Sequence, residues 1–251
     1  MKNLQINATS IVGRRQNNED ALLESPELGL YAVCDGMGGY AGGEVASKTA
    51  VEVLEHFFHA NLKDGGITWP YALDRARSLK ENMVDVAVRL AHQAILARRK
   101  GPLAQMGTTV VVLAEDDDQE VVLGHIGDSR IYRLRDGGLE LLTVDHSMYN
   151  ECKAAGFELP PLEEFPHKNI VTRALGIPTS SGESPELRRE AFLPGDVFLL
   201  CTDGLHDVVS DARIEELLRS VPFEEVADRL VMEAYEAGSR DNITCLLLRR
   251  G

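Results

Sequence analysis

Cysteine is scarce in this chain, and its distribution excludes several kinds of site. Only four cysteines occur among 251 residues, and no two of them form a CxxC pair. Cys34, Cys201 and Cys245 lie in apolar runs, where a thiol behaves as a small hydrophobic side chain. We therefore expect buried thiols, and neither a disulfide framework nor a zinc site.

Long hydrophobic runs are missing as well. No apolar stretch approaches the roughly 20 residues that a membrane-spanning helix requires. The first residues, MKNLQINATS, lack the apolar centre of a signal peptide. We therefore expect a cytoplasmic protein with no membrane span.

Basic residues are few relative to acidic ones. The chain has 26 Lys and Arg against 40 Asp and Glu, and its formal net charge is −14. A nucleic-acid-binding protein normally presents a basic face, so we expect no nucleic-acid partner. A GxxxxGK[ST] phosphate-binding loop is also absent from the sequence.

The sequence does contain acidic residues beside apolar, strand-like runs. The settings are YAVCDGMGG at 31–39, GHIGDSR at 124–130, FLLCTDGL at 198–205 and SRDNITCLLL at 239–248, with the carboxylates Asp35, Asp128, Asp203 and Asp241. RQNNED at 15–20 adds Glu19 and Asp20. An ionised carboxylate at the end of a buried strand needs a partner, and no comparable set of Lys or Arg accompanies these motifs. Magnesium and manganese prefer oxygen ligands, so the pattern predicts a metal-dependent hydrolase of phosphate esters.

A simpler interpretation exists for each Asp-Gly pair, because Asp-Gly is a common turn dipeptide. Asp64-Gly65 and Asp136-Gly137 have polar or hairpin surroundings, and we interpret them as turns. Asp35-Gly36 and Asp203-Gly204 instead follow runs apolar enough for central strands and precede expected helices. Together with GDSR and DN at other strand boundaries, they indicate ligands.

Hydrolysis of a phosphate ester gives a reason for such a set. Two divalent ions roughly 3.5–4 Å apart can lower the pKa of a bridging water and neutralise phosphoryl charge. Gly36 has no Cβ, so its backbone can approach closely and its carbonyl could be a ligand. Arg15 lies near the acidic motif, and its planar guanidinium suits phosphate geometry.

Helical and strand-like patterns alternate along the chain. We expect helices at 43–62, 70–100, 211–220 and 223–237, and strands at 3–10, 28–34, 108–114, 120–126, 129–135, 139–143, 186–193, 196–202 and 242–249. Leu73 and Ala76 belong to the inward face of the second helix. No linker, repeat or charge block marks a boundary, so we expect one layered α+β domain over 1–251.

Eight motifs occur in the order seen in bacterial metal-dependent PPM-family (type 2C) protein serine/threonine phosphatases. They are RQNNED, DGMGG, MGTT at 106–109, GDSR, DHS at 145–147, VTRALG at 171–176, TDGL and RDN. The resemblance spans about Val12 to Leu248. It implies a four-layer αββα sandwich, in which two central, mainly antiparallel β-sheets are flanked by helices. The irregular stretch 147–182 corresponds to a flap that shapes substrate access.

The resemblance also implies roles for residues. Asp35 would bridge two Mn²⁺ or Mg²⁺ ions, and Asp203 and Asp241 would complete one site. The Gly36 carbonyl would serve the other site, where Glu19 and Asp20 match residues that act largely through water. A third ion would be held by the residues matching Asp128 and Asp203, and Arg15 matches the phosphate-binding arginine.

Two positions depart from the family pattern. Met37 and Tyr40 stand where relatives carry histidine, so the group that protonates the leaving oxygen is not assigned by resemblance. His146 in DHS could donate a proton near neutral pH, or it could hydrogen-bond behind the site. His125 lies within an expected strand, and we interpret it as a packed core histidine.

The main hypothesis is a phosphatase of phosphoserine and phosphothreonine proteins that uses metal-activated water and opposes a bacterial serine/threonine kinase. The departures at Met37 and Tyr40 motivate an alternative, a pseudophosphatase that binds phosphoproteins without turnover. A third hypothesis, hydrolysis of small phosphate esters, is disfavoured by the acidic composition. The absence of a coiled-coil heptad leads us to expect a monomer.

Overall fold

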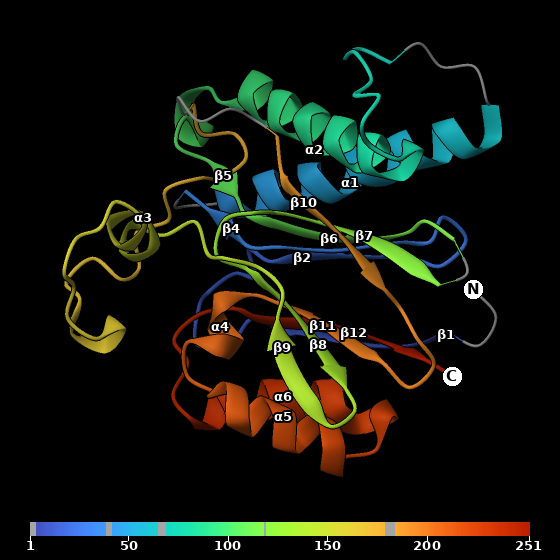
Figure 1. Cartoon of the computed structure of the whole chain (residues 1–251). Coiled ribbons are helices and arrows are strands. Elements are labelled where there is room, and N and C mark those ends of the chain that lie inside the picture. The colour runs from blue at the N-terminus through green and yellow to red at the C-terminus, as the bar shows by residue number, and fades with distance from the viewer. Residues whose placement is uncertain (1–3, 39–41, 65–68, 118, 179–183) are drawn as a thin grey trace.

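Antiparallel strands build two sheets that pack face to face. The computed structural model describes residues 4–38, 42–64, 69–117, 119–178 and 184–251. Within them, two five-stranded sheets form the centre, and a helix pair covers the outer face of each (Figure 1). This arrangement confirms the predicted α+β, four-layer αββα sandwich.

The first sheet carries most of the C-terminal strands. Its order is β1 (Leu4–Ile11), β12 (Ile243–Arg250), β11 (Val197–Cys201), β8 (Arg130–Arg135) and β9 (Gly138–Leu141), with antiparallel pairing. Successive side chains of a strand point to opposite faces. Cys245 and Leu247 accordingly face the C-terminal helices, whereas Leu246 and Leu248 pack between the sheets.

The second sheet is built mainly from the N-terminal half. Its order is β10 (Glu186–Ala191), β7 (Glu120–Ile126), β6 (Val110–Glu115), β3 (Leu30–Cys34) and β2 (Ala21–Ser25), again antiparallel. Tyr31 and Val33 face the first sheet, and Ala32 and Cys34 face the helices. Both faces of β3 are therefore buried, which explains why this strand is apolar throughout.

Two helix pairs form the outer layers. α1 (Gly42–Asp64) and α2 (Leu79–Arg98) cover the second sheet, and α5 (Asp211–Ser220) and α6 (Phe223–Glu236) cover the first (Figure 1). None of the helices in the described part of the chain combines the length and apolarity needed to cross a bilayer.

The predicted start of the second helix at residue 70 is wrong. Ser78 forms a capping box, in which its Oγ accepts a hydrogen bond from the Glu81 N–H at 3.1 Å and the Glu81 carboxylate accepts from the Ser78 N–H at 2.7 Å. This reciprocal pair satisfies free donors at the first turn and fixes the start of α2. Leu73 therefore lies outside the helix and is 52% exposed, contrary to the expected inward position.

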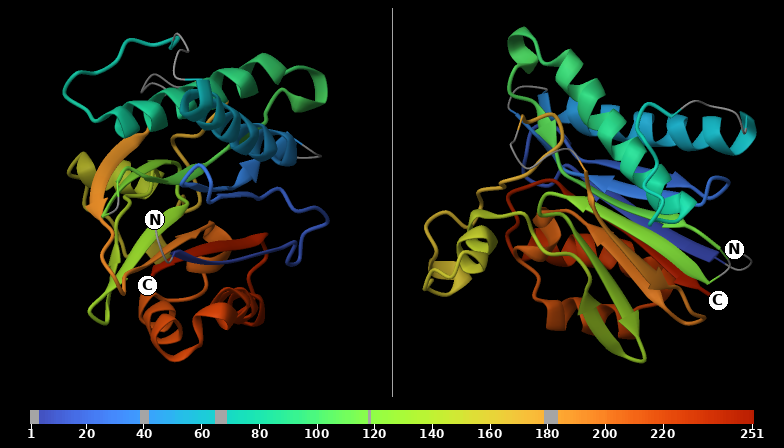
Figure 2. Two further views of the ribbon diagram at one scale, coloured as in Figure 1. Left: turned by 90° about the vertical axis from the view of Figure 1, so that its right-hand side faces the viewer. Right: turned by 45° about the horizontal axis from the view of Figure 1, so that its top comes forward.

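Shorter elements surround one end of the sandwich. They are β4 (Gly36–Met37), β5 (Gly107–Thr108), α3 (Met148–Ala154), α4 (Asp203–His206) and the 3₁₀ turns η1 (Gly101–Leu103) and η2 (Leu162–Glu164). The stretch with α3 projects to one side of the sheets (Figure 2). It corresponds to the predicted flap, of which residues 179–182 lie outside the described part of the chain.

Candidate metal centre

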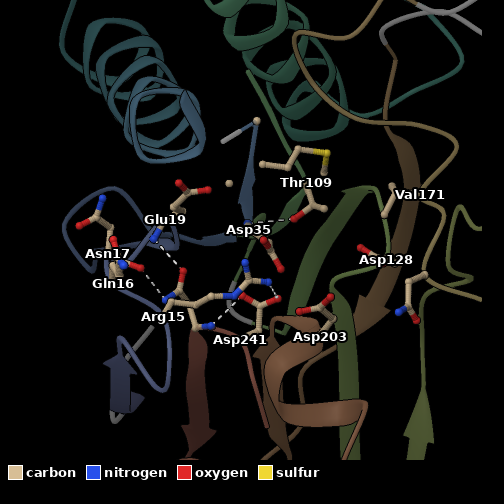
Figure 3. Close-up of a pocket in the computed structure, with 15 residues that line it drawn as sticks. Arg15, Gln16, Asn17, Glu19, Asp35, Thr109, Asp128, Val171, Asp203 and Asp241 are labelled. Carbon is tan, nitrogen blue, oxygen red and sulfur yellow. Dashed lines mark hydrogen bonds and ion pairs between the residues drawn. The ribbon is translucent and has the colours of Figure 1, made fainter. Parts of the chain in front are cut away.

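Four aspartates converge where strands of both sheets end. Asp35 follows β3, and Asp128 lies in the turn between β7 and β8. Asp203 is the first residue of α4 and is separated from β11 by Thr202 alone, and Asp241 precedes β12. All four line one pocket of about 650 Å³ (Figure 3). The structure therefore brings together carboxylates that are far apart in the sequence.

The glycines after Asp35 and Asp203 permit this approach. A Cβ on Gly36 would lie 2.3 Å from the carbonyl oxygen of Gly43 and 2.4 Å from that of Glu19. A Cβ on Gly204 would lie 1.9 Å from the carbonyl oxygen of Asn242. Only glycine fits backbones this close. The two Asp-Gly pairs are thus close-packing positions, whereas Asp136-Gly137 is a hairpin turn with positive φ angles of 51° and 81°.

Burial, reinforced by repulsion between carboxylates, disfavours ionisation in the pocket. Burial, and then the charge of Asp203, raises the pKa of Asp35 well above its ordinary value. Burial and neighbouring carboxylates likewise raise the pKa of Asp128 to about 7 and that of Asp203 to about 6. Asp203 Oδ1 is buried and has no hydrogen-bond partner among the described residues. Such a cluster needs cations to ionise together.

The RQNNED motif contributes two acids in different positions. Glu19 lines the pocket, and its backbone N–H donates to Asn242 Oδ1 at 2.8 Å. Burial raises the pKa of Glu19 and, to about 7, that of Asp20. Asp20 lies deeper, where its Oδ2 accepts hydrogen bonds from the hydroxyls of Thr202 at 3.0 Å and Thr244 at 2.6 Å. Asp20 is therefore tied to β12 and the end of β11.

Arg15 lies at the mouth of this pocket. Its Nη2 donates to Asp241 Oδ2 at 2.6 Å, and its Nε donates to the carbonyl of Arg240 at 3.1 Å. The side chain remains 57% exposed. The guanidinium is held beside the carboxylates and can still meet a ligand that enters from solvent (Figure 3).

The structure does not bring His146 into the pocket. Its Nδ1 accepts a hydrogen bond from the Gly127 N–H at 2.9 Å, and its Nε2 lies 2.8 Å from Glu186 Oε1. The side chain is 8% exposed and sits behind the Asp128 turn. Of the two interpretations left open for His146, this placement favours hydrogen bonding behind the site over proton donation. His125 is buried, as expected of a core histidine.

The two departures from the family pattern have different outcomes. Met37 lines the pocket and offers no titratable proton there. Tyr40 lies outside the described residues.

Several residues at the site had no role assigned from sequence. Thr109 Oγ1 accepts from the Asp35 N–H at 3.0 Å, and Thr108 Oγ1 donates to the Asp35 carbonyl at 2.8 Å. Asn242 Nδ2 donates to the carbonyls of Val12 and Asn17, both at 2.9 Å, and so shapes the Arg15 loop. The available signals were the MGTT motif, which contains Thr108 and Thr109, and the RDN motif, in which Asn242 directly follows Asp241.

The donors fit a hard divalent cation. Among the described residues that line the pocket, the titratable ones are carboxylates and Arg15, with no histidine or cysteine. The orphaned oxygen of Asp203 and the close backbone at Gly36 add to this fit. Carboxylate and carbonyl oxygens are the ligands that magnesium and manganese prefer.

An αββα sandwich with a carboxylate cluster where strands of both sheets end is the arrangement that the resemblance to metal-dependent phosphatases implied. The chain belongs to the protein phosphatase 2C family, whose model matches residues 9–247. This confirms the family suggested by the eight motifs.

Curated relatives and solved structures agree with this assignment. Serine/threonine protein phosphatase PstP of Mycobacterium tuberculosis is 36% identical over 236 residues, which cover 93% of this chain and 42% of PstP. The chain thus spans less than half the length of that relative. Protein phosphatase PhpP of Streptococcus pneumoniae is 31% identical, with 96% of this chain and 94% of PhpP covered.

Two solved structures match over nearly the whole chain. The crystal structure of the M. tuberculosis phosphatase PstP/Ppp has a TM-score of 0.84 at 34% identity, with 98% of each chain covered. The PstP catalytic domain in complex with two manganese ions has a TM-score of 0.81 at 34% identity, with 98% of this chain and 97% of that one covered.

Proposed function

We propose that this chain is a metal-dependent protein phosphatase that hydrolyses phosphoserine and phosphothreonine. The observation that carries the proposal is the convergence of Asp35, Asp128, Asp203 and Asp241 in one pocket, with Arg15 at its mouth. The similarity to PstP and PhpP, both named as protein phosphatases, supports it.

In this proposal Asp35, Asp203 and Asp241 would hold one ion, and Asp35 and the Gly36 carbonyl would hold a second, with Glu19 and Asp20 acting largely through water. Asp128 together with Asp203 would hold a third ion. The cations are Mn²⁺ or Mg²⁺, and the manganese complex of the PstP catalytic domain supports this choice.

When bound, these ions supply Lewis acidity that activates water and neutralises phosphoryl charge. The protein's own residues bind and orient the substrate. Arg15 offers a planar set of N–H donors to phosphoryl oxygens, and Asp241 holds that guanidinium in place through the 2.6 Å hydrogen bond. Asn169 and Val171 of the predicted flap line the pocket and shape the entry of the phosphorylated side chain.

The wider context follows from the same proposal. The substrates are phosphoproteins, and their phosphorylation comes from a cognate bacterial serine/threonine kinase. The chain acts as a cytoplasmic monomer whose single catalytic domain spans 1–251, with residues 147–182 as the flap.

A phosphate-release assay tests the proposed activity. We expect release from a phosphothreonine peptide with Mn²⁺, loss of release with excess chelator, and loss in Asp35→Asn. Asp136→Asn is the matched control, because it makes the same change at an Asp-Gly turn in the β8–β9 hairpin. No release from folded, metal-loaded wild type would instead favour the phosphoprotein-binding pseudophosphatase.

A substrate comparison tests the class of ester. The phosphopeptide and nucleoside phosphates are compared at equal concentration, and we expect the peptide to be preferred. A preference for nucleotides would overturn the proposed substrate class without contradicting the proposed metal centre.

A further inference from the structure

A buried polar cluster behind the Asp128 turn is not used by the proposed chemistry. It contains His125 on β7, His146 after β9, Arg173 in the VTRALG segment and Glu186 on β10. The two imidazole rings are stacked, with centroids 4.8 Å apart and planes inclined by 10°. The ligating atoms of the two histidines and Glu186 lie within 4.8 Å of one another.

The hydrogen bonds of the cluster argue against a metal ion there. Because His146 Nδ1 accepts from the Gly127 N–H, the proton of the neutral ring must be on Nε2, which then donates to Glu186. His125 Nε2 faces the carbonyl of Val144 at 3.0 Å and therefore also carries a proton. A metal would need a lone pair on each of these nitrogens.

Arg173 already supplies a cation to the cluster. Its Nη1 lies 2.8 Å from His146 Nε2 and 3.2 Å from Glu186 Oε1, and its Nη2 donates to the Ser184 carbonyl at 2.8 Å. The Arg173 side chain is 16% exposed. Its largely buried charge is thus paired with Glu186, the first residue of β10.

His146 connects two segments of the chain through both its ring and its backbone. Its ring accepts from the Gly127 N–H, and its own N–H donates to the Gly127 carbonyl at 2.9 Å. Its carbonyl accepts from the Thr172 N–H at 2.8 Å. One residue therefore joins the turn that carries Asp128 to the segment that leaves the flap.

Both connected segments contribute to the catalytic pocket. Asp128 directly follows Gly127, and Val171 directly precedes Thr172. Val171 also forms an isolated β-bridge with Ser147, the residue after His146. A change in the cluster would consequently move a metal ligand and a flap residue relative to each other.

We propose that His146, Glu186 and Arg173 are positioning residues that hold the Asp128 turn and the flap return, residues 171–175, in register. The ring acceptor of His146 sets the position of Asp128, and hence the affinity of the third cation site. The Glu186–Arg173 pair sets the position of the flap return, and hence the affinity for substrate. This inference rests on the proposed function of the pocket.

Two substitutions of His146 separate its proposed effect on the Asp128 turn from its proposed effect on the flap return. His146→Asn keeps an oxygen near the Nδ1 position that can accept from Gly127, but it loses the donor to Glu186. His146→Gln places its amide near the Nε2 position and removes the Nδ1 acceptor of the Gly127 N–H. Glu186→Gln removes only the charge, and the Glu186 side chain is 53% exposed, so the substitution leaves core packing unchanged.

Manganese titration by calorimetry, phosphopeptide kinetics and amide hydrogen exchange provide independent measurements. We expect His146→Gln to weaken manganese binding at the third cation site by about tenfold, because it leaves the buried Gly127 N–H unpaired. His146→Asn and Glu186→Gln should instead raise KM by roughly threefold to tenfold and speed exchange in residues 171–175, with kcat nearly unchanged. Glu190→Gln, on the same strand but outside the cluster, should leave manganese affinity and exchange unchanged.

The result that overturns the inference is wild-type manganese affinity, KM and hydrogen exchange in the folded His146 variants. If these variants fail to fold, Glu186→Gln is the deciding variant. Wild-type KM and wild-type hydrogen exchange in Glu186→Gln would show that the Glu186–Arg173 pair does not position the flap return. Failure of the proposed function is recognised separately, because the wild type would then release no phosphate or Asp35→Asn would retain metal-dependent release.

Discussion

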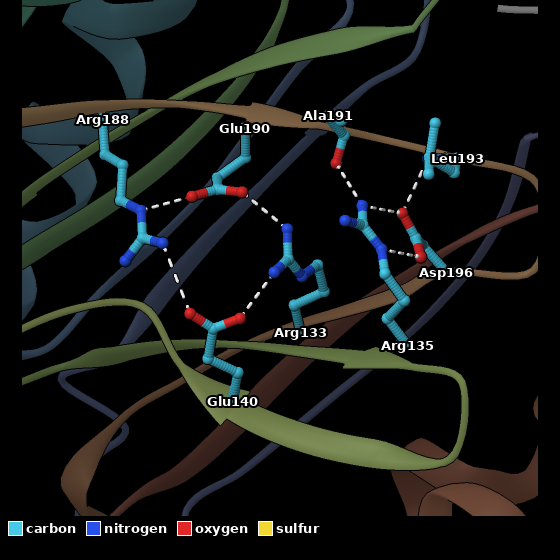
Figure 4. A network of polar contacts seen from close by, with 8 residues as sticks. All are labelled: Arg133, Arg135, Glu140, Arg188, Glu190, Ala191, Leu193 and Asp196. Atoms are coloured by element: carbon cyan, nitrogen blue, oxygen red, sulfur yellow. Dashed lines mark hydrogen bonds and ion pairs between the residues drawn. The ribbon is translucent and has the colours of Figure 1, made fainter.

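Two groups of charged side chains connect the sheets, and they are built in opposite ways. The pocket lined by Asp35, Asp128, Asp203 and Asp241 brings carboxylates together from the ends of both sheets. A second group, the charged ring, lies beside the edge strands β9 and β10 and alternates in sign around Arg133, Glu140, Arg188 and Glu190 (Figure 4). Arg133 lies 2.5 Å from both glutamates, and Arg188 contacts the same two.

The difference shows how to separate a ligand site from a structural ion-pair network. Burial raises the pKa of Asp35 and Asp203, and neighbouring carboxylates raise it further. In the ring, burial opposes ionisation of Glu140, but hydrogen bonds and charge from Arg133 outweigh it and lower the pKa. Uncompensated charge in the pocket calls for an external cation, whereas compensated charge in the ring needs none.

The largest effect should come from breaking the pocket. Asp35→Asn is expected to reduce phosphopeptide turnover by about a thousandfold or more, because several kcal/mol of metal-dependent stabilisation is lost. It should also remove most of the rise in Tm that Mn²⁺ produces in wild type. Kinetics and thermal unfolding check both effects, and unchanged turnover would show that Asp35 is not a ligand.

Manganese should stabilise the protein more strongly at higher pH. Without metal, carboxylates whose pKa is raised from 3.8 to about 6 or 7 bind more protons in the folded state than in the unfolded state. Their contribution to stability is therefore present at low pH and is lost as pH rises through that window. Bound metal displaces those protons, so each proton released should add about 1.4 kcal/mol of manganese stabilisation per pH unit.

Thermal unfolding with and without Mn²⁺, from about pH 5.5 to about pH 8, measures this linkage. The difference between the two series cancels groups that titrate alike in both, including the buried histidines. A manganese effect that does not grow with pH would contradict the raised pKa values.

Arg15→Lys should have a smaller effect on the pocket. The substitution keeps the charge but loses the planar set of donors, so kcat/KM for the phosphopeptide should fall roughly tenfold. Arg14→Lys is the control, because Arg14 lies next to it and contacts Tyr235 instead of the pocket. Equal effects of the two substitutions would argue against a specific phosphate contact.

The smallest effect should come from breaking the ring. Glu190→Gln is expected to lower the free energy of unfolding by about 1–2 kcal/mol, because Arg133 is largely buried and loses a charged partner. Turnover and the manganese effect should stay at wild-type values. Urea unfolding measures the stability change, and a loss of activity would show that the ring also acts on the pocket.

Much of the architecture was predictable because local patterns carried it. Apolar runs identified β3 and β11, and helical spacing identified α1, α5 and α6. The start of α2 was missed although the capping signal Ser78 with Glu81 was present in the sequence. β2 was missed because the short run after RQNNED was not recognised as a strand.

Some features of the site could be predicted from the sequence, and others could not. The four aspartates at strand ends could be expected to converge, because strands of packed sheets end at a common edge. The sequence placed His146 near the site without indicating the direction of its ring. That direction depends on Gly127 and Glu186, which lie on segments separated from it by 19 and 40 residues.

The sequence by itself determined the family, the layered fold and the set of carboxylates, because these depend on short motifs and on strand and helix periodicity. Tertiary structure alone decided that Asp20 bonds Thr202 and Thr244, that His146 faces Glu186 instead of the pocket, and that the charged ring closes between β8, β9 and β10. The physical reason is that periodicity sets the face from which a side chain leaves its element. The partner it meets there is set by packing between distant segments.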